Sequence, residues 1–69
     1  MKFLVTGANG FVGQAFSAAA LLRGVSITGS TRAPAVLLPT VKNIVVGEVD
    51  EKTDWTLALA GCDVVVHLA

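Results

Sequence analysis

The sequence predicts an α/β fold built on a parallel β-sheet, and two observations lead to this prediction. Short apolar segments that suit strands alternate with segments of helical pattern along the 69 residues, and this alternation is typical of a parallel sheet with helices on its faces. The first of these segments, residues 3–5, is apolar at every position. Strands that are covered on both faces show this pattern.

Residues 2–6 are predicted to form the first strand, and residues 11–23 are predicted to form a helix that no proline interrupts. Gly24 follows at the position where a helix commonly ends. The helix is expected to pack against the sheet through apolar side chains at helical spacing: Phe11, Ala15, Ala18, Ala19 and Leu22.

Three further strands are predicted, over residues 25–30, 43–49 and 62–69. Connections between parallel strands are right-handed, so the second and third strands are expected on one side of the first strand. The fourth strand then returns to the other side of the first. The predicted order is therefore 3-2-1-4, with all strands parallel.

Two connecting segments complete the prediction. Pro34 and Pro39 favour a loop over residues 33–42 that contains at most one helical turn. Thr53 or Asp54 can cap a short helix before the fourth strand. That helix would carry three large apolar side chains and end at a glycine: Trp55, Leu57, Leu59 and Gly61.

The composition excludes several classes of protein. A chain with 54% hydrophobic and 14% charged residues is too apolar for a disordered tail. A net charge of zero argues against a nucleic-acid-binding arm or a basic helix on a membrane surface. The single cysteine rules out an internal disulfide or a multi-cysteine metal site. Because no apolar segment approaches the roughly 20 residues of a membrane helix, we expect a cytoplasmic protein without nucleic-acid or membrane partners.

The segment TGANGFVG, residues 6–13, places three glycines at intervals of three directly after the first strand. Gly7 allows a sharp turn, Gly10 lets backbone N–H groups approach a pyrophosphate, and Gly13 allows the helix to pack closely. The spacing differs by one residue from the G-x-G-x-x-G fingerprint, but a strand before it and a helix after it are the context that a dinucleotide-binding motif requires. The alternative is a glycine turn that serves packing alone.

Three segments, KFLVTGANGFVG, GEVDEKTDW and CDVVVHLA, resemble the N-terminal part of the extended short-chain dehydrogenase/reductases. Within that family the similarity is greatest to bacterial nucleotide-sugar epimerases, dehydratases and 4-reductases. The resemblance covers essentially all 69 residues. It implies that residues 1–69 are the N-terminal part of a NAD(P)-binding Rossmann domain, a doubly wound sheet that continues beyond them.

The resemblance also implies a set of cofactor contacts. The pyrophosphate would be met by the glycine turn and the start of the helix, at Gly7, Gly10, Phe11, Val12 and Gly13. Glu48 and Val49 would lie beside the adenine, where Glu48 departs from the aspartate that the family usually has. Leu68 and Ala69 would line the ribose on the nicotinamide side.

The end of the second strand indicates which dinucleotide binds. Enzymes that use NAD usually have a carboxylate there, about 20 residues after the glycines, for the ribose 2′-hydroxyl. This chain has Ser30, Thr31 and Arg32, with no acid among them, and a guanidinium can pair with a 2′-phosphate. Thr31 and Arg32 are therefore predicted to contact the cofactor, and NADP is favoured over NAD. TRAP, residues 31–34, also resembles the VRDP of NADP-dependent family members. The alternative is that Arg32 is a solvated surface residue.

No catalytic residue is predicted within the chain. The family uses a Ser or Thr with a Tyr-x-x-x-Lys pair, and this sequence has no tyrosine, so we expect the catalytic residues beyond Ala69. The leading hypothesis is that the chain supplies the cofactor side of an NAD(P)-dependent nucleotide-sugar epimerase, dehydratase or reductase that forms a homodimer. The alternatives are a non-catalytic NAD(P)-binding redox sensor and a folding unit with no function of its own.

Other residues of reactive type are interpreted as structural. His67 lies within an apolar strand, and a packed, hydrogen-bonded histidine is expected there. Cys62 adjoins Asp63, whereas a reactive thiol needs an electropositive neighbourhood. The acidic residues 50, 51 and 54 lack the pattern of a calcium-binding loop. No metal site is predicted.

Overall fold

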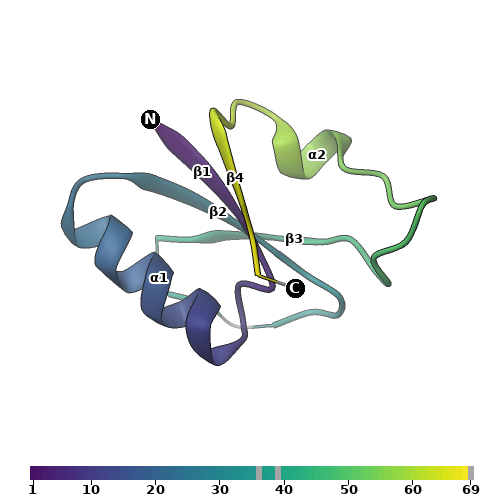
Figure 1. The fold of residues 1–69 in the computed structure, drawn as a ribbon, viewed down its shortest axis with the longest axis horizontal. Helices are drawn as coiled ribbons and strands as arrows, with labels where there is room; N and C mark the ends of the chain where they lie inside the picture. Colours follow the sequence, from purple (N-terminus) through teal and green to yellow (C-terminus); the bar gives the residue numbers. More distant parts are fainter. Residues whose placement is uncertain (36, 39, 69) are drawn as a thin grey trace.

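The computed structural model describes residues 1–35, 37, 38 and 40–68. Its four strands form one parallel sheet in the order β3-β2-β1-β4 (Figure 1), which confirms the predicted 3-2-1-4 order and the partial Rossmann-like α/β fold. Within these residues no helix is both long enough and apolar enough to cross a bilayer. The elements in chain order are β1 (Lys2–Thr6), α1 (Phe11–Leu22), β2 (Ser26–Thr31), β3 (Lys42–Val45), α2 (Thr56–Leu59) and β4 (Val64–His67).

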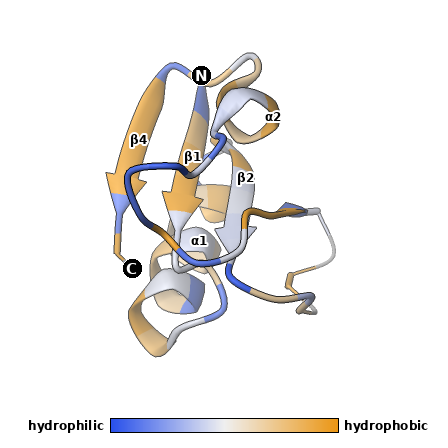
Figure 2. Ribbon diagram, turned by 90° about the vertical axis from the view of Figure 1, so that its right-hand side faces the viewer, coloured by the Kyte–Doolittle hydropathy of each residue, from blue (hydrophilic) through white to orange (hydrophobic). Residues whose placement is uncertain are grey.

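The two helices lie on opposite faces of the sheet (Figures 1 and 2). Side chains alternate between the faces along a strand, and β1 shows this at its centre. Val5 packs in the core beside Ala20 of α1. Leu4, its neighbour, borders a hollow on the other face that Trp55 and Leu59 also line. Both β1 side chains are 0% exposed, as the uninterrupted apolar segment predicts.

The carboxyl ends of the strands meet along one edge of the sheet, toward which the strand arrows point in Figure 2. Thr6, the last residue of β1, pairs with Ser30 of β2 and with His67 of β4. Ser30 also pairs with Ile44 of β3. The segments that leave these ends therefore lie close together, and parallel sheets form their binding sites at this edge.

The face of α1 that contacts the sheet differs from the predicted one. The residues expected to make the contact are largely exposed: Phe11, Ala15, Ala18, Ala19 and Leu22. The helix instead buries Gly13, Ser17 and Ala20. Because alanines and other apolar residues are spread around most of the circumference of this helix, hydrophobic periodicity does not identify the face that contacts the sheet. Its rotation follows from a close contact at Gly13, described below.

The predicted strand boundaries need small corrections. β3 ends at Val45 rather than at residue 49, since the chain turns at Gly47, where φ is +74°, a conformation that suits glycine. β2 ends one residue later than predicted, and β4 covers only Val64–His67. The loop expected over residues 33–42 contains no helix in the part that the structure describes. Pro39 lies outside the described residues.

The short helix predicted after residue 53 is present as the single turn α2. Asp54 Oδ1 accepts a hydrogen bond from the backbone N–H of Thr56 at 2.9 Å, and hydrogen bonds from the side chain and backbone of Thr56 lower the pKa of Asp54. Thr53 Oγ1 instead donates to the carbonyl oxygen of Glu48 at 3.0 Å. The N-cap residue of α2 is Trp55, which makes no side-chain cap hydrogen bond, so the prediction that Thr53 or Asp54 caps the helix is wrong, and Asp54 binds the Thr56 N–H from one residue before the cap.

The outer edge of β4 has no neighbouring strand in the described sheet. β4 pairs with β1 on one side and ends the described sheet on the other, and its Val65 side chain is 52% exposed. Apolar strand edges with unpaired backbone groups associate with other strands. We expect the 69-residue chain to self-associate as its concentration rises, and Val65→Lys to shift it toward the monomer. Sedimentation velocity over a range of concentrations measures this, and a wild-type monomer at every concentration would contradict it.

Candidate functional site

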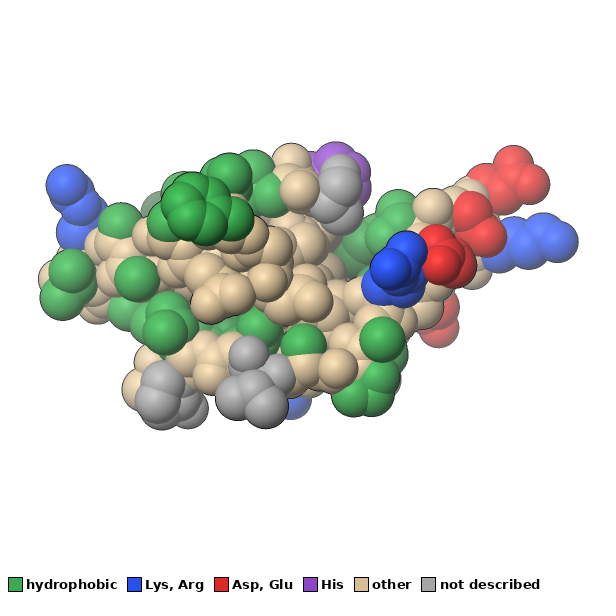
Figure 3. All heavy atoms as spheres, turned by 90° about the horizontal axis from the view of Figure 1, so that it is seen from below, with side chains coloured by type: hydrophobic (Ala, Val, Ile, Leu, Met, Phe, Trp, Pro, Cys, Tyr) green, Lys and Arg blue, Asp and Glu red, His purple; other side chains and the backbone are tan. Residues whose placement is uncertain are grey.

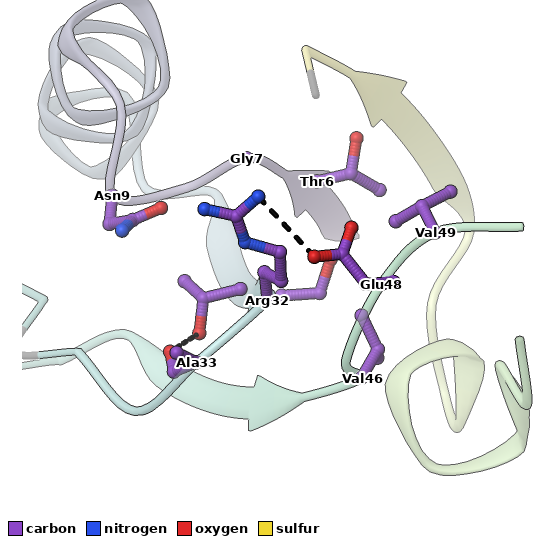
Figure 4. A pocket seen from close by; sticks show the side chains of 10 residues that line it. Thr6, Gly7, Asn9, Arg32, Ala33, Val46, Glu48 and Val49 are labelled. Atoms are coloured by element: carbon purple, nitrogen blue, oxygen red, sulfur yellow. Dashed lines mark hydrogen bonds and ion pairs between the residues drawn. The ribbon is translucent and has the colours of Figure 1, made fainter.

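A cavity of about 390 Å³ opens at the carboxyl edge of the sheet (Figure 4). It lies between the turn after β1, the end of β2 and the segment after β3. Its lining is mostly small or polar, and consists of Thr6, Gly7, Asn9, Ser30, Thr31, Arg32, Ala33, Val46, Glu48 and Val49. Five of the predicted site residues line it, namely Gly7, Thr31, Arg32, Glu48 and Val49, and four more lie at the start of the helix beside it, namely Gly10, Phe11, Val12 and Gly13.

The turn between β1 and α1 has the backbone geometry expected of its first two glycines. Gly7 has a φ of +66°, which side chains rarely tolerate. Its carbonyl oxygen accepts a hydrogen bond from the N–H of Gly10 at 3.0 Å, and this bond closes the turn. Gly10 is the N-cap of α1, with φ −74° and ψ 168°. Because that conformation is open to any residue, backbone strain does not explain the glycine at position 10.

Gly13 is required by close packing between α1 and the turn. A Cβ atom added there would overlap the carbonyl oxygen of Gly7 and lie 3.0 Å from the Cα of Ala8. Both neighbours are backbone atoms, so they cannot move aside as a side chain can. The prediction of a close approach at Gly13 is confirmed, and the contact is made with the turn rather than with the strands themselves.

The N-terminus of α1 presents unpaired backbone donors beside the cavity. The first N–H groups of a helix have no partner within it, and Gly10 has no side chain to cap them. The first turn contains no acidic residue, and the helix dipole makes this end positive. Phe11 and Val12 are 91% and 60% exposed, so their side chains do not line the cavity. Their backbone N–H groups are the atoms that could bind an anion. The arrangement suits an anion such as phosphate.

Arg32 and Glu48, which were predicted to serve different parts of a ligand, form an ion pair. A guanidinium nitrogen of Arg32 lies 3.5 Å from a carboxylate oxygen of Glu48 (Figure 4). The side chains are 72% and 77% exposed. The pair joins the end of β2 to the segment after β3 across the rim of the cavity. Sequence reasoning placed each residue at this edge but did not predict the pair.

Thr31 lines the cavity but directs its hydroxyl group into the protein. The residue is 2% exposed, and Oγ1 donates to the carbonyl oxygen of Ala33 at 2.7 Å. Asn43 Oδ1 lies 3.1 Å from the same hydroxyl, and Asn43 Nδ2 donates to the carbonyl oxygen of Ala35. Thr31 and Asn43 therefore hold the loop that carries Arg32. Sequence reasoning missed Asn43, whose signal is a single amide at the start of an apolar segment, residues 44–46.

The remaining predicted site residues lie around β4 and after β3. Val49 borders the cavity. Leu68 lies outside its lining, and its backbone N–H donates to Thr6 Oγ1 at 3.0 Å. The same hydroxyl lies 2.7 Å from His67 Nδ1, so the expected hydrogen bond is present, but His67 is exposed rather than packed in the core. Ala69 lies outside the described residues.

The model of the NAD dependent epimerase/dehydratase family matches residues 3–69, which includes the glycine turn, the cavity lining and β4. Among curated proteins, no sequence matches the chain at a significant level.

Proposed function

The chain belongs to the NAD dependent epimerase/dehydratase family, and from this premise we propose that it forms the dinucleotide-binding part of a nucleotide-sugar epimerase, dehydratase or reductase. The observation that carries the proposal is the uncapped start of α1 beside the cavity, where Gly10 leaves the backbone donors open. A pyrophosphate needs such donors with no Cβ in the way. The residues therefore fit the group that the family uses.

We propose that each part of the dinucleotide contacts a different set of residues. The pyrophosphate would lie on the glycine turn and the start of α1, against Gly7, Gly10, Phe11, Val12 and Gly13. Thr31 and Arg32 would lie at the 2′ position of the adenosine ribose, and Glu48 and Val49 beside the adenine. Leu68 and Ala69 would lie along the nicotinamide half.

The chemistry is divided between this chain and residues outside it. When bound, the nicotinamide supplies or accepts a hydride, which we propose passes to or from a sugar carbon. The chain has no tyrosine, so the proposal assigns proton transfer to a Tyr-x-x-x-Lys pair beyond the 69 residues, in a cytoplasmic homodimer. A non-catalytic redox sensor shares the binding site and lacks that pair. A gene that encodes the glycine turn without a later Tyr-x-x-x-Lys segment would favour the sensor.

Cofactor binding is the direct test of the proposal. Isothermal titration of the protein with NADP⁺ and with NAD⁺ is expected to show binding of both, with NADP⁺ tighter. Absence of heat with either dinucleotide, for a protein that melts cooperatively, would overturn the proposed function.

Arg32→Ala tests the assignment of the 2′ position. We expect it to weaken NADP⁺ binding by about tenfold, because hydrogen bonds to a charged group contribute about 1.5–3 kcal/mol. NAD⁺ has a hydroxyl in place of the phosphate, so its affinity should change far less. Titration of the variant with each dinucleotide measures the two effects. Equal losses for both would make Arg32 an adenine-stacking or general surface residue.

A further inference from the structure

On the basis of the proposed function, we infer that Glu48 governs the choice between NADP and NAD by competing with the 2′-phosphate for Arg32. The geometry is the starting point, since the carboxylate of Glu48 lies 3.5 Å from the guanidinium at the rim of the cavity. A guanidinium that binds a phosphate through two parallel hydrogen bonds uses the same donors that a carboxylate takes. The phosphate and Glu48 are therefore rivals for one group.

The charges that line the cavity explain why Glu48 should oppose binding of NADP and not of NAD. Among the residues that line it, Arg32 and Glu48 are the only charged ones, so the positive and negative charges cancel. On the face seen in Figure 3, acidic side chains gather at one end of the molecule, with basic side chains beside them. A 2′-phosphate brings further negative charge close to Glu48, whereas a 2′-hydroxyl leaves the ion pair intact.

Both side chains are free to separate, because each is more than 70% exposed. Exposed ion pairs contribute little to stability and are readily exchanged for another partner. The backbone around Glu48 is held independently of the pair. Thr53 Oγ1 donates to the Glu48 carbonyl oxygen at 3.0 Å, and the N–H of Val46 donates to the carbonyl oxygen of Thr31 at 2.9 Å. Loss of the carboxylate charge should therefore leave the segment in place.

The length of Glu48 contributes to the competition. The family resemblance implies an aspartate at this position, and glutamate is longer by one methylene group. The observed pair spans from the segment after β3 to the end of β2 (Figure 4). Glu48→Asp is therefore expected to loosen the pair and to act in the same direction as loss of the charge.

Glu48→Gln tests the inference in the whole protein by isothermal titration with NADP⁺ and NAD⁺. The amide keeps the size of the side chain and an oxygen that can accept a hydrogen bond from adenine, but it removes the charge. We expect the affinity for NADP⁺ relative to that for NAD⁺ to rise about two- to fivefold, the range for an exposed ion pair, because a change in the adenine contact affects both dinucleotides alike. In the Arg32→Ala background the substitution should give no such gain.

Glu51→Gln is the matched control, because it removes the same charge from an exposed residue that does not line the cavity. It should leave both affinities unchanged, and thermal melts of all variants should coincide with the wild type. An unchanged ratio of the two affinities in Glu48→Gln, or an equal change in Glu51→Gln, would overturn the role of Glu48 while leaving the proposed function in place. A wild-type protein that binds neither dinucleotide would overturn both.

Discussion

Gly10→Val is expected to abolish dinucleotide binding while the protein stays folded. The backbone of Gly10 has φ −74°, which valine adopts without strain, and an added Cβ would lie 3.3 Å from the Gly7 carbonyl oxygen. This contact is tight, and it needs a shift of a few tenths of an ångström in the turn. The exposed branched side chain would instead cover the donors at the start of α1. We expect a loss of at least about 100-fold in affinity, equivalent to about 2.7 kcal/mol.

Isothermal titration with NADP⁺, together with a thermal melt, checks this expectation. Val12→Ala is the matched control, since Val12 is 60% exposed and its proposed contact is through the backbone N–H. That variant should bind as the wild type does. Unchanged affinity in Gly10→Val would contradict the pyrophosphate assignment, and a lost melting transition would show that position 10 is required for folding.

Gly13→Ala is expected to lower the stability of the fold rather than to act on binding alone. A single methyl group at this position overlaps the Gly7 carbonyl oxygen and approaches the Ala8 Cα to 3.0 Å, and neither backbone atom can move without opening the turn. Overpacking of this kind costs about 3 kcal/mol. A chain of 69 residues has a total stability of only about 3–10 kcal/mol, so this substitution should remove between about a third and all of it.

Urea unfolding followed by circular dichroism measures the effect of Gly13→Ala. The control is Ala18→Val, which adds more volume to the same helix at an exposed position and should cost less than about 1 kcal/mol. If Gly13→Ala unfolds at the wild-type urea concentration, the close contact between α1 and the turn does not exist in solution.

The contrast between these glycines shows what the sequence could predict. The glycine turn is predicted by a strong local signal, three glycines at fixed spacing after an apolar segment. The strand order is predicted by the series of apolar segments together with the general handedness of crossover connections. Gly7 and Gly13 have the backbone roles that the spacing predicts, with a φ of +66° at Gly7 and no room for a Cβ at Gly13. These features need no knowledge of distant parts of the chain.

The features that escaped prediction depend on contacts that the hydrophobic pattern does not encode. The contact face of α1 is set by Gly13 against Gly7, because apolar residues spread widely around the helix give no clear stripe. The pairing of Arg32 with Glu48 depends on where β3 ends, and that end is set by Gly47 rather than by a change in hydrophobicity. Thr31 is polar and next to Arg32, yet its hydroxyl turns inward to Ala33. Sequence alone does not give the direction of a side chain at the end of a strand.

The central position of β1 has a consequence for how the protein is made. β1 is translated before the other described strands, but one of its edges stays unpaired until β4 has been made: Phe3 pairs with Val64, 61 residues later. At about 5–20 residues per second, translation leaves that edge bare for on the order of seconds. Pairing across so long a separation is also slow to form. The strand whose central side chains are fully buried in the finished sheet is therefore open to a wrong partner during synthesis.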